Sequence, residues 1–229
     1  MEIELMYHSP LWVCAKAIRK CWASEDKSDT VFHQDLGFPA ILLDNGEYFP
    51  CEAGYKDKEL IERVGNKNKH ASTLEHLVYT FDIDGTSRSL LQEHARHRIA
   101  SISVQSSRYT IEKVLDGLGT IEECLVMTGD KDIDELNISH MTKLSKLIEQ
   151  RGKTLPRDIS KYALVEAYKT SFVWTVNARS LQNFLQLRTN KAALWEIRQL
   201  SYELYNILPE EHKYLFFDSL YQDTKTKGK

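Results

Sequence analysis

A basic cluster near the middle of the chain carries the most specific chemistry that this sequence offers. It combines three arginines and a histidine with hydroxyl side chains: Arg96, His97, Arg98, Ser101, Ser103, Ser106, Ser107 and Arg108. A guanidinium group can bind two phosphate oxygens at once, and serine hydroxyls can add hydrogen bonds to the same anion. The cluster therefore predicts a binding site for a small anionic ligand. Arg-His-Arg alone would instead favour a solvated basic helix end.

A second polar cluster follows in residues 174–188. Asn177 is expected to close a strand, and Arg179 and Asn183 are four residues apart, so they share one helical face. Arg188 lies at helical spacing from three apolar residues: Leu181, Phe184 and Leu185. An arginine on an apolar face either snorkels to the edge of the core or binds a buried anion. The nearby Arg179 and Asn183 favour the buried anion.

Other kinds of site are less favoured by the sequence. A metal site is a weak alternative, because no carboxylate or cysteine pattern completes the nearby histidines: His70, His76, His94 and His97. We therefore expect no metal. Ser106 has no nucleophile-elbow glycines beside it, so we expect it to form hydrogen bonds and not to act as a nucleophile. The chain also lacks a glycine-rich phosphate loop, so side chains must hold any nucleotide.

The composition is that of a soluble globular protein. The 229 residues are 42% hydrophobic and 28% charged, with a net charge of −3, which argues against broad binding to nucleic acid or to an anionic membrane. No apolar stretch approaches the length of a transmembrane helix, and the first residues do not resemble a secretory signal. The cysteines are scattered, which predicts reduced thiols in the cytoplasm: Cys14, Cys21, Cys51 and Cys124.

The elements that must position these clusters are predicted by the hydrophobic pattern. Alternating runs predict strands over residues 1–7, 77–83 and 171–176. Apolar spacing predicts a short helix over 57–64 and longer helices over 10–22, 133–150, 157–169 and 179–208. Residues 24–57 are rich in Asp, Gly and Pro and are expected to form a loop. We expect one α+β domain over residues 1–222, followed by a disordered tail, 223–229.

Local signals place the ends of several helices. Ser9, Ser72 and Ser87 are expected N-caps, with Glu75 completing a capping box after Ser72. Consecutive side chains of a helix point about 100° apart, so Arg96 and Arg98 share one side only in an extended or turn segment. The Arg-His-Arg triplet is therefore expected at or just past a helix C-terminus, where cations are favoured.

Taken together, these motifs resemble the flavin-dependent thymidylate synthases. The family signature, Arg-His-Arg followed after seven residues by Ser, is present from Arg96 to Ser106. Upstream, the segment His-Ala-Ser-Thr-Leu-Glu-His at 70–76 resembles the family's Ser-x-x-Glu-His segment. Downstream, Trp-Thr-Val-Asn-Ala-Arg-Ser-Leu at 174–181 is similar almost word for word. The resemblance covers about residues 57–215.

The resemblance implies an α+β fold with a central flavin-binding sheet and long flanking helices. It implies a homotetramer that methylates dUMP to dTMP, with methylenetetrahydrofolate as carbon donor, FAD as cofactor and NADPH as reductant. It assigns FAD binding to one set of residues: Ser72, Arg96, His97, Arg98, Asn177, Ala178, Arg179 and Asn183. It assigns dUMP binding to a second set: Glu93, Arg96, Val104, Gln105, Ser106, Ser107, Arg108, Lys161 and Arg188. Arg188 would also activate the uracil ring.

Several positions depart from the commonest family pattern. Val104 stands where a glutamate is usual, and Glu93 stands where a glutamine is usual. Lys161 replaces an arginine, which keeps the charge but loses the bidentate geometry. The loop over residues 30–50 is longer than the family requires, and we expect a lid there.

Two other classes of function remain open from the sequence. The same arginines could serve a nucleic-acid-binding module, although the acidic net charge and the absence of basic-aromatic stripes weaken that reading. A degenerate family member that binds flavin or dUMP as a regulator is suggested by Val104 and the other departures.

Overall fold

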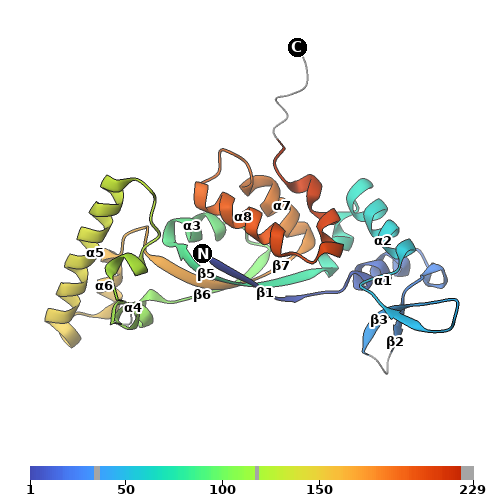
Figure 1. The fold of residues 1–229 in the computed structure, drawn as a ribbon, viewed down its shortest axis with the longest axis horizontal. Helices are drawn as coiled ribbons and strands as arrows, with labels where there is room; N and C mark the ends of the chain where they lie inside the picture. The colour runs from blue at the N-terminus through green and yellow to red at the C-terminus, as the bar shows by residue number, and fades with distance from the viewer. Residues whose placement is uncertain (34–36, 117–118, 223–229) are drawn as a thin grey trace, which may run out of the picture. The chain divides into compact units, whose positions relative to one another are not determined.

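The computed structural model describes residues 1–33, 37–116 and 119–222 (Figure 1). A four-stranded sheet has the order β1-β5-β7-β6, with β1 at Glu2–His8, β5 at Val78–Ser87, β7 at Lys169–Asn177 and β6 at Ala100–Val104. A separate antiparallel sheet consists of β2 at Val31–His33, β3 at Phe38–Leu42 and β4 at Tyr48–Pro50. The α+β class is confirmed, whereas the loop expected over residues 24–57 is wrong because these three short strands pair with one another.

The helices are mostly short. Their bounds are α1 Leu11–Cys21, α2 Tyr55–Ile61, α3 Arg88–His94, α4 Ser107–Asp116, α5 Lys131–Arg151, α6 Arg157–Ser160, α7 Ala178–Arg188 and α8 Trp195–Ile207. Single 3-10 turns join many of them, and a π-helical turn follows α2 at Glu62–Lys67. Within the residues that the structure describes, no helix is long and apolar enough to cross a membrane.

Contacts between residues divide the chain into two compact units. Unit 1 comprises residues 1–4, 82–98 and 102–174, and unit 2 comprises residues 5–81, 99–101 and 175–222. All four strands of the larger sheet contribute residues to both units. The expectation of one domain over residues 1–222 stays a prediction, and the tail over residues 223–229 lies outside the described residues.

Unit 1 holds α3 to α6 and most of the basic cluster, residues 96–98 and 103–108. The part of β7 in this unit buries every second side chain, Thr170, Phe172 and Trp174, which is the period of a strand packed on one face. A second core forms where α4 and α5 cover the segment around residue 125, with Ile111, Cys124, Leu125, Met141, Leu144 and Tyr168 buried together.

Unit 2 holds α1, α2, α7 and α8. Helix α7 contacts both α8 and the 3-10 helix Ala71–His76. Its apolar face is completely buried at Leu181, Phe184 and Leu185, as the spacing predicted. Asn177 ends β7 and caps α7, because its side-chain oxygen accepts a hydrogen bond from the Ser180 amide at 2.9 Å.

Two of the predicted helices are broken in the structure. The helix expected over 179–208 is interrupted between α7 and α8: the Thr189 hydroxyl donates back to the Leu185 carbonyl at 2.6 Å, and Asn190 accepts from the Ala192 amide. The helix expected over 157–169 ends after α6 and one 3-10 turn, because Tyr168 pairs with Leu125 as an isolated β-bridge.

Some predicted caps and ends also differ. The Ser9 hydroxyl accepts from the Val78 amide at 3.0 Å, so it links β5 and does not cap α1. Ser72 caps nothing, because the turn around it begins after His70. Strand β5 continues past the expected stop through Gly85, whose φ of 72° suits a glycine. Ser87 caps α3 as predicted, accepting from the Leu90 amide at 3.0 Å.

Candidate functional site

The Arg-His-Arg triplet lies where the sequence placed it. Helix α3 ends at His94, and Arg96 to Arg98 follow directly. Arg96 is largely exposed and pairs with the carboxylate of Glu93, with Nη1 and Oε2 3.4 Å apart. Arg98 is also exposed, and His97 is half-buried. Cationic side chains therefore surround the C-terminal end of this helix and are accessible to a ligand.

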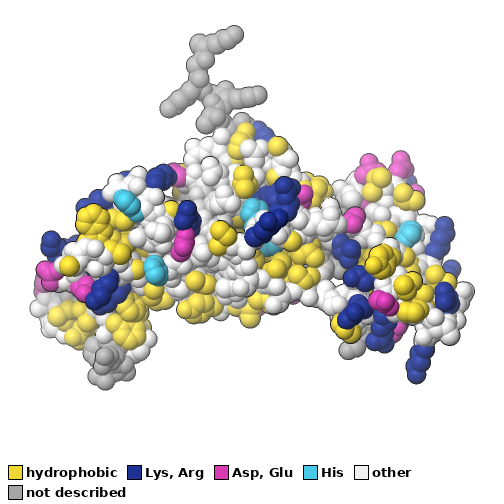
Figure 2. Space-filling view, turned by 180° about the vertical axis from the view of Figure 1, so that it is seen from behind, with side chains coloured by type: hydrophobic (Ala, Val, Ile, Leu, Met, Phe, Trp, Pro, Cys, Tyr) yellow, Lys and Arg dark blue, Asp and Glu magenta, His cyan; other side chains and the backbone are white. Residues whose placement is uncertain are grey.

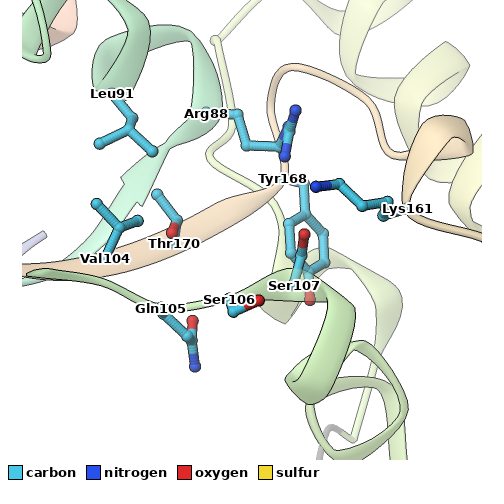
Figure 3. A pocket seen from close by; sticks show the side chains of 9 residues that line it. All are labelled: Arg88, Leu91, Val104, Gln105, Ser106, Ser107, Lys161, Tyr168 and Thr170. Carbon is cyan, nitrogen blue, oxygen red and sulfur yellow. The ribbon is translucent and has the colours of Figure 1, made fainter. Parts of the chain in front are cut away.

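A pocket of about 210 Å³ lies in unit 1, close to the second half of the family signature (Figure 3). Residues that the resemblance assigns to dUMP line it: Val104, Gln105, Ser106, Ser107 and Lys161. The same pocket is lined by residues that the sequence did not single out: Arg88, Leu91, Tyr168 and Thr170. Binding of dUMP by these residues stays a prediction, but the structure brings them together around one cavity.

Main-chain hydrogen bonds hold the walls of this pocket in place. The Gln105 amide donates to the Ser171 carbonyl at 2.8 Å, which fixes the end of β6 against β7. The Arg88 amide donates to the Tyr168 carbonyl at 3.1 Å, which fixes the start of α3 against the residue before β7. Lys161 enters the pocket from the 3-10 turn Lys161–Ala163. Segments far apart in the sequence thus line one cavity.

The pocket has two chemically different ends. Arg88 and Lys161 point their charged groups toward each other beside the Tyr168 ring, whereas Leu91 and Val104 lie at the opposite end (Figure 3). No carboxylate is among the described lining residues, and neither cation forms an ion pair with a described carboxylate. Burial raises the pKa of Tyr168 to about 12, so its ring stays neutral. This arrangement can bind an anion with an apolar part attached.

Three residues assigned to dUMP in unit 1 do not line this pocket. Glu93 and Arg96 pair with each other near the end of α3. Arg108, in α4, places its guanidinium 4.5 Å from the centre of the Tyr109 ring and donates to the Tyr109 hydroxyl. Arg108 is exposed and available to a ligand at the surface.

The remaining predicted residues belong to unit 2. Ser72, Arg179 and Asn183 are exposed, whereas the Ala178 side chain is buried and its amide donates to the Leu77 carbonyl at 2.8 Å. Arg179 pairs with Glu75 at 2.7 Å, with both side chains about half exposed. Arg188 is the last residue of α7 and is half-buried, next to a completely buried apolar face.

The donors of these residues suit FAD. The dinucleotide has a diphosphate, and the exposed guanidinium groups of Arg96, Arg98 and Arg179 each offer several N–H donors to such an anion. Ser72 and Asn183 add exposed polar groups that can bind ribose or ring atoms. The chemistry of the residues present is therefore compatible with this cofactor.

The histidines that the sequence suggested as metal ligands do not form a metal-binding group in the described part of the chain. The His94 ring is buried against the rings of Phe172 and Trp174, with centroids 4.7 and 4.5 Å away. The group with ligand atoms close enough together is His8, Glu52 and His212, in unit 2, which the sequence did not suggest. These residues are far apart in the sequence, so no spacing rule could have found them.

Hydrogen bonds within the protein explain why His212 and Glu52 lie close together. His212 is completely buried; its Nδ1 lies 2.7 Å from the Tyr79 hydroxyl, and its Nε2 lies 3.4 Å from Glu52. Glu52 also accepts from the Leu11 amide at 3.1 Å. Burial acts to raise the pKa of Glu52, but the hydrogen bond and the charge of His212 outweigh it, so the pKa lies below its ordinary value.

One signal in the sequence could have pointed to Arg88. It is the first residue of α3, directly after the Ser87 cap. A cation in the first turn of a helix opposes the helix macrodipole, which favours anions at that end. Residues that break such a local rule are often functional, so the conflict marks Arg88 as a candidate.

Comparisons with known proteins agree with these motifs. Residues 4–212 match the family model described as thymidylate synthase complementing protein. The flavin-dependent thymidylate synthase of Wolinella succinogenes is 47% identical over 220 residues, covering 94% of this chain and 97% of that protein. The enzyme of Campylobacter jejuni is 45% identical over 230 residues, covering 97% and 99%.

A solved structure agrees as well. The crystal structure of the flavin-dependent thymidylate synthase of Helicobacter pylori, complexed with FAD and dUMP, superimposes with a TM-score of 0.82. It is 39% identical, and the match covers 96% of this chain and 100% of that one. The sequence, the family model and the fold thus agree over nearly the whole length. The chain belongs to the flavin-dependent thymidylate synthase family.

Proposed function

We propose that this protein methylates dUMP to dTMP in the cytoplasm, with methylenetetrahydrofolate as carbon donor, NADPH as reductant and FAD as bound cofactor. The observation that carries the proposal is the pocket of unit 1, where Ser106, Ser107 and Lys161 surround one cavity with a cationic end. A nucleoside monophosphate matches the two ends of this pocket, because it joins a phosphate dianion to a less polar ring. Relatives with this name and a solved structure with FAD and dUMP support the same reaction.

Arg188 is the residue that we propose activates the uracil ring. It is half-buried at the end of α7, beside side chains that exclude water. A guanidinium in such a place interacts more strongly with negative charge that develops on the substrate than it would in water. Hydrogen bonding to the ring edge would make the carbon that receives the methyl group more nucleophilic.

FAD, when bound, supplies the hydride chemistry of the reaction. Arg96, Arg98 and Arg179 would bind its diphosphate, and Ser72, His97, Asn177, Ala178 and Asn183 would contact the rest of the cofactor. Of these, Asn177 already uses its side-chain oxygen to cap α7 and Ala178 already uses its amide, so their remaining polar atoms would make these contacts.

The test is substitution of Arg188. The Arg188→Ala variant should lose dTMP formation by at least about 100-fold, as expected for removal of a charged group that stabilises a transition state. It should retain FAD, which is measured from the visible absorption spectrum after desalting. The exposed Gln186 of the same helix provides the control, because Gln186→Ala should leave both properties unchanged. Undiminished turnover of Arg188→Ala would remove this residue from the mechanism.

Measurements of dTMP formation, flavin binding and oligonucleotide binding by the wild-type protein separate the alternative functions. A wild-type protein that binds FAD and dUMP but forms no dTMP would support the regulatory reading. Salt-sensitive oligonucleotide binding without flavin would support the nucleic-acid reading. The surface gives that reading little support, since Lys and Arg side chains on the face in Figure 2 are scattered among acidic and hydrophobic ones.

We also propose that the protein forms a homotetramer. Hydrophobic side chains around the signature are exposed in the single chain: Ile99, Ile102, Val104 and Tyr109. Large apolar side chains that are exposed together commonly mark a surface where protein chains associate. Light scattering coupled to size exclusion would measure the mass, and a monomer would contradict the proposal.

A further inference from the structure

Arg88 occupies an unusual position for a cation. It begins α3, where the helix macrodipole disfavours positive charge, and its main chain is fixed to Tyr168 by the 3.1 Å hydrogen bond. Its side chain is half-buried and lines the pocket of unit 1. A surface arginine without a role would turn its guanidinium toward solvent.

The guanidinium of Arg88 is not fully hydrogen-bonded within the protein. Its Nε atom is buried and has no hydrogen-bond partner among the described residues. A buried donor without an acceptor is costly, and most buried polar atoms in folded proteins have a partner. An acceptor supplied by a ligand in the pocket would remove that cost.

The surroundings of Arg88 specify the charge of that ligand. Lys161 points its ammonium group toward the Arg88 guanidinium, so two positive charges share one end of the pocket (Figure 3). The repulsion between two like charges is offset when an anion binds between them. The hydroxyls of Ser106 and Ser107 are close by, and the first turn of α4, which begins at Ser107, contains no acidic residue. A dianion is therefore favoured.

The geometry of the two cations indicates a phosphate group. Lys161 is a point charge, whereas Arg88 offers donors in a planar fork that matches two oxygens of a phosphate. The opposite end of the pocket, with Leu91 and Val104, accepts an apolar group joined to that phosphate. A phosphate monoester of a nucleoside combines both features in one molecule.

We propose that Arg88 binds the phosphate of the substrate together with Lys161, which makes it a further substrate-binding residue. This inference rests on the proposed function, because dUMP is the phosphate monoester concerned. Arg88 supplies the fork-shaped donor set that Lys161 cannot, and the serine hydroxyls complete the shell of donors.

Titration calorimetry on the FAD-loaded protein tests this role with two ligands, dUMP and deoxyuridine, which differ only in the phosphate. Arg88→Gln should weaken dUMP binding by about 10- to 100-fold, the value of one charge-assisted hydrogen-bonding group. Binding of deoxyuridine should not change. Arg88→Lys should fall between the two, because it keeps the charge and loses the fork.

Lys146→Gln is the matched control, since Lys146 is an exposed cation of α5 in the same unit and lies outside the pocket. It should leave both affinities unchanged. Circular dichroism and the FAD content report whether Arg88→Gln is folded. An equal loss for dUMP and deoxyuridine, or no loss for dUMP, would overturn the proposal.

The proposed function and this inference fail in different ways. If the wild-type protein binds no dUMP, the proposed function falls, and titration with inorganic phosphate then decides the role of Arg88. Weaker phosphate binding by Arg88→Gln than by the wild type would support the role, and equal binding would reject it.

Discussion

Two arginines in different units show opposite ways of placing a cation inside a protein. Arg19, in α1 of unit 2, is 6% exposed, and its Nε donates to Asp57 at 2.5 Å. The other oxygen of Asp57 accepts from the hydroxyls of Ser28 and Thr30, both at 2.6 Å. Arg88, in unit 1, has a buried Nε with no hydrogen-bond partner in the described part of the chain, and it faces a second cation (Figure 3).

The difference separates structural charges from functional ones. Around Arg19 and Asp57, the protein itself supplies a counter-ion and hydrogen bonds, so the buried charges are compensated in the folded chain. Around Arg88 the described residues supply no acceptor for Nε, and in our proposal the phosphate of the substrate supplies one. A buried charge by itself therefore does not indicate a binding site. A buried charged group that lacks a hydrogen-bond acceptor among the described residues is the better indicator.

The largest expected effect concerns the compensated pair. Removing one partner leaves the other charged and buried, so Asp57→Ala should lower the free energy of unfolding by about 3–5 kcal/mol. Urea denaturation measures the change. Asp26→Ala, at an exposed position nearby, should stay within about 0.5 kcal/mol of the wild type.

Two further variants sharpen this prediction. The double variant Arg19→Met, Asp57→Leu should lose less stability than Asp57→Ala, because it leaves no charge unpaired. Arg88→Gln should change stability by less than about 1 kcal/mol, because no described residue accepts from Arg88 Nε and would lose its partner in the variant. Equal losses for Asp57→Ala and Arg88→Gln would break the comparison.

A smaller effect should come from adding the missing partner. A ligand that binds only the folded state at 100 times its dissociation constant stabilises that state by about 2.7 kcal/mol. With dUMP at that excess, the wild type should gain this amount in a denaturation experiment. At the same dUMP concentration, the double variant Arg88→Gln, Lys161→Gln should gain much less. Equal gains would show that dUMP does not use these cations.

The smallest effect should be a pH dependence in unit 2. The pKa of Glu52 in the folded protein lies below its ordinary value of 4.5, chiefly because His212 outweighs the effect of burial. A lowered folded pKa stabilises the folded state above the unfolded pKa, and this contribution is lost as the pH falls through the folded pKa.

Glu52→Gln should therefore make stability less dependent on pH below about 4.5, relative to the wild type. Thermal unfolding at a series of acidic pH values measures the slope. Glu4→Gln removes an exposed carboxyl and should leave the slope unchanged. An unaltered slope in Glu52→Gln would indicate that His212 does not stabilise the charged carboxylate.

The sequence predicted those parts of the fold that depend on neighbouring residues. Alternation predicted β5 and β7, because a strand buries every second side chain. Ser87 was expected to cap a helix and does so, and Asn177 was expected to close a strand and does end β7. Asn177 also caps α7, which the sequence analysis did not predict. The Arg-His-Arg triplet was expected after a helix C-terminus because consecutive helical side chains diverge, and it lies there.

Local signals failed where distant partners decide the structure. Strands β2 to β4 are short, and β3 and β4 contain proline, so local sequence did not predict them and only their pairing makes them a sheet. Residues after α6 have helical spacing, yet Tyr168 pairs with Leu125. Ser9 has the features of an N-cap, yet its hydroxyl binds the Val78 amide.

The sequence by itself determined the family of this protein and the chemistry of its ligands. The three family motifs occur in this chain in the family's order, and their arginine, serine and asparagine side chains offer the donors that anionic ligands need. Only the tertiary structure decided which cations meet. The Arg88 and Ser89 amides donate to the carbonyls of Tyr168 and Glu166, which holds the start of α3 against the segment that follows the Lys161–Ala163 turn. The side chains of Arg88 and Lys161 therefore line one cavity. The cost of burying a polar atom depends on every group around it, and that is a property of the folded chain alone.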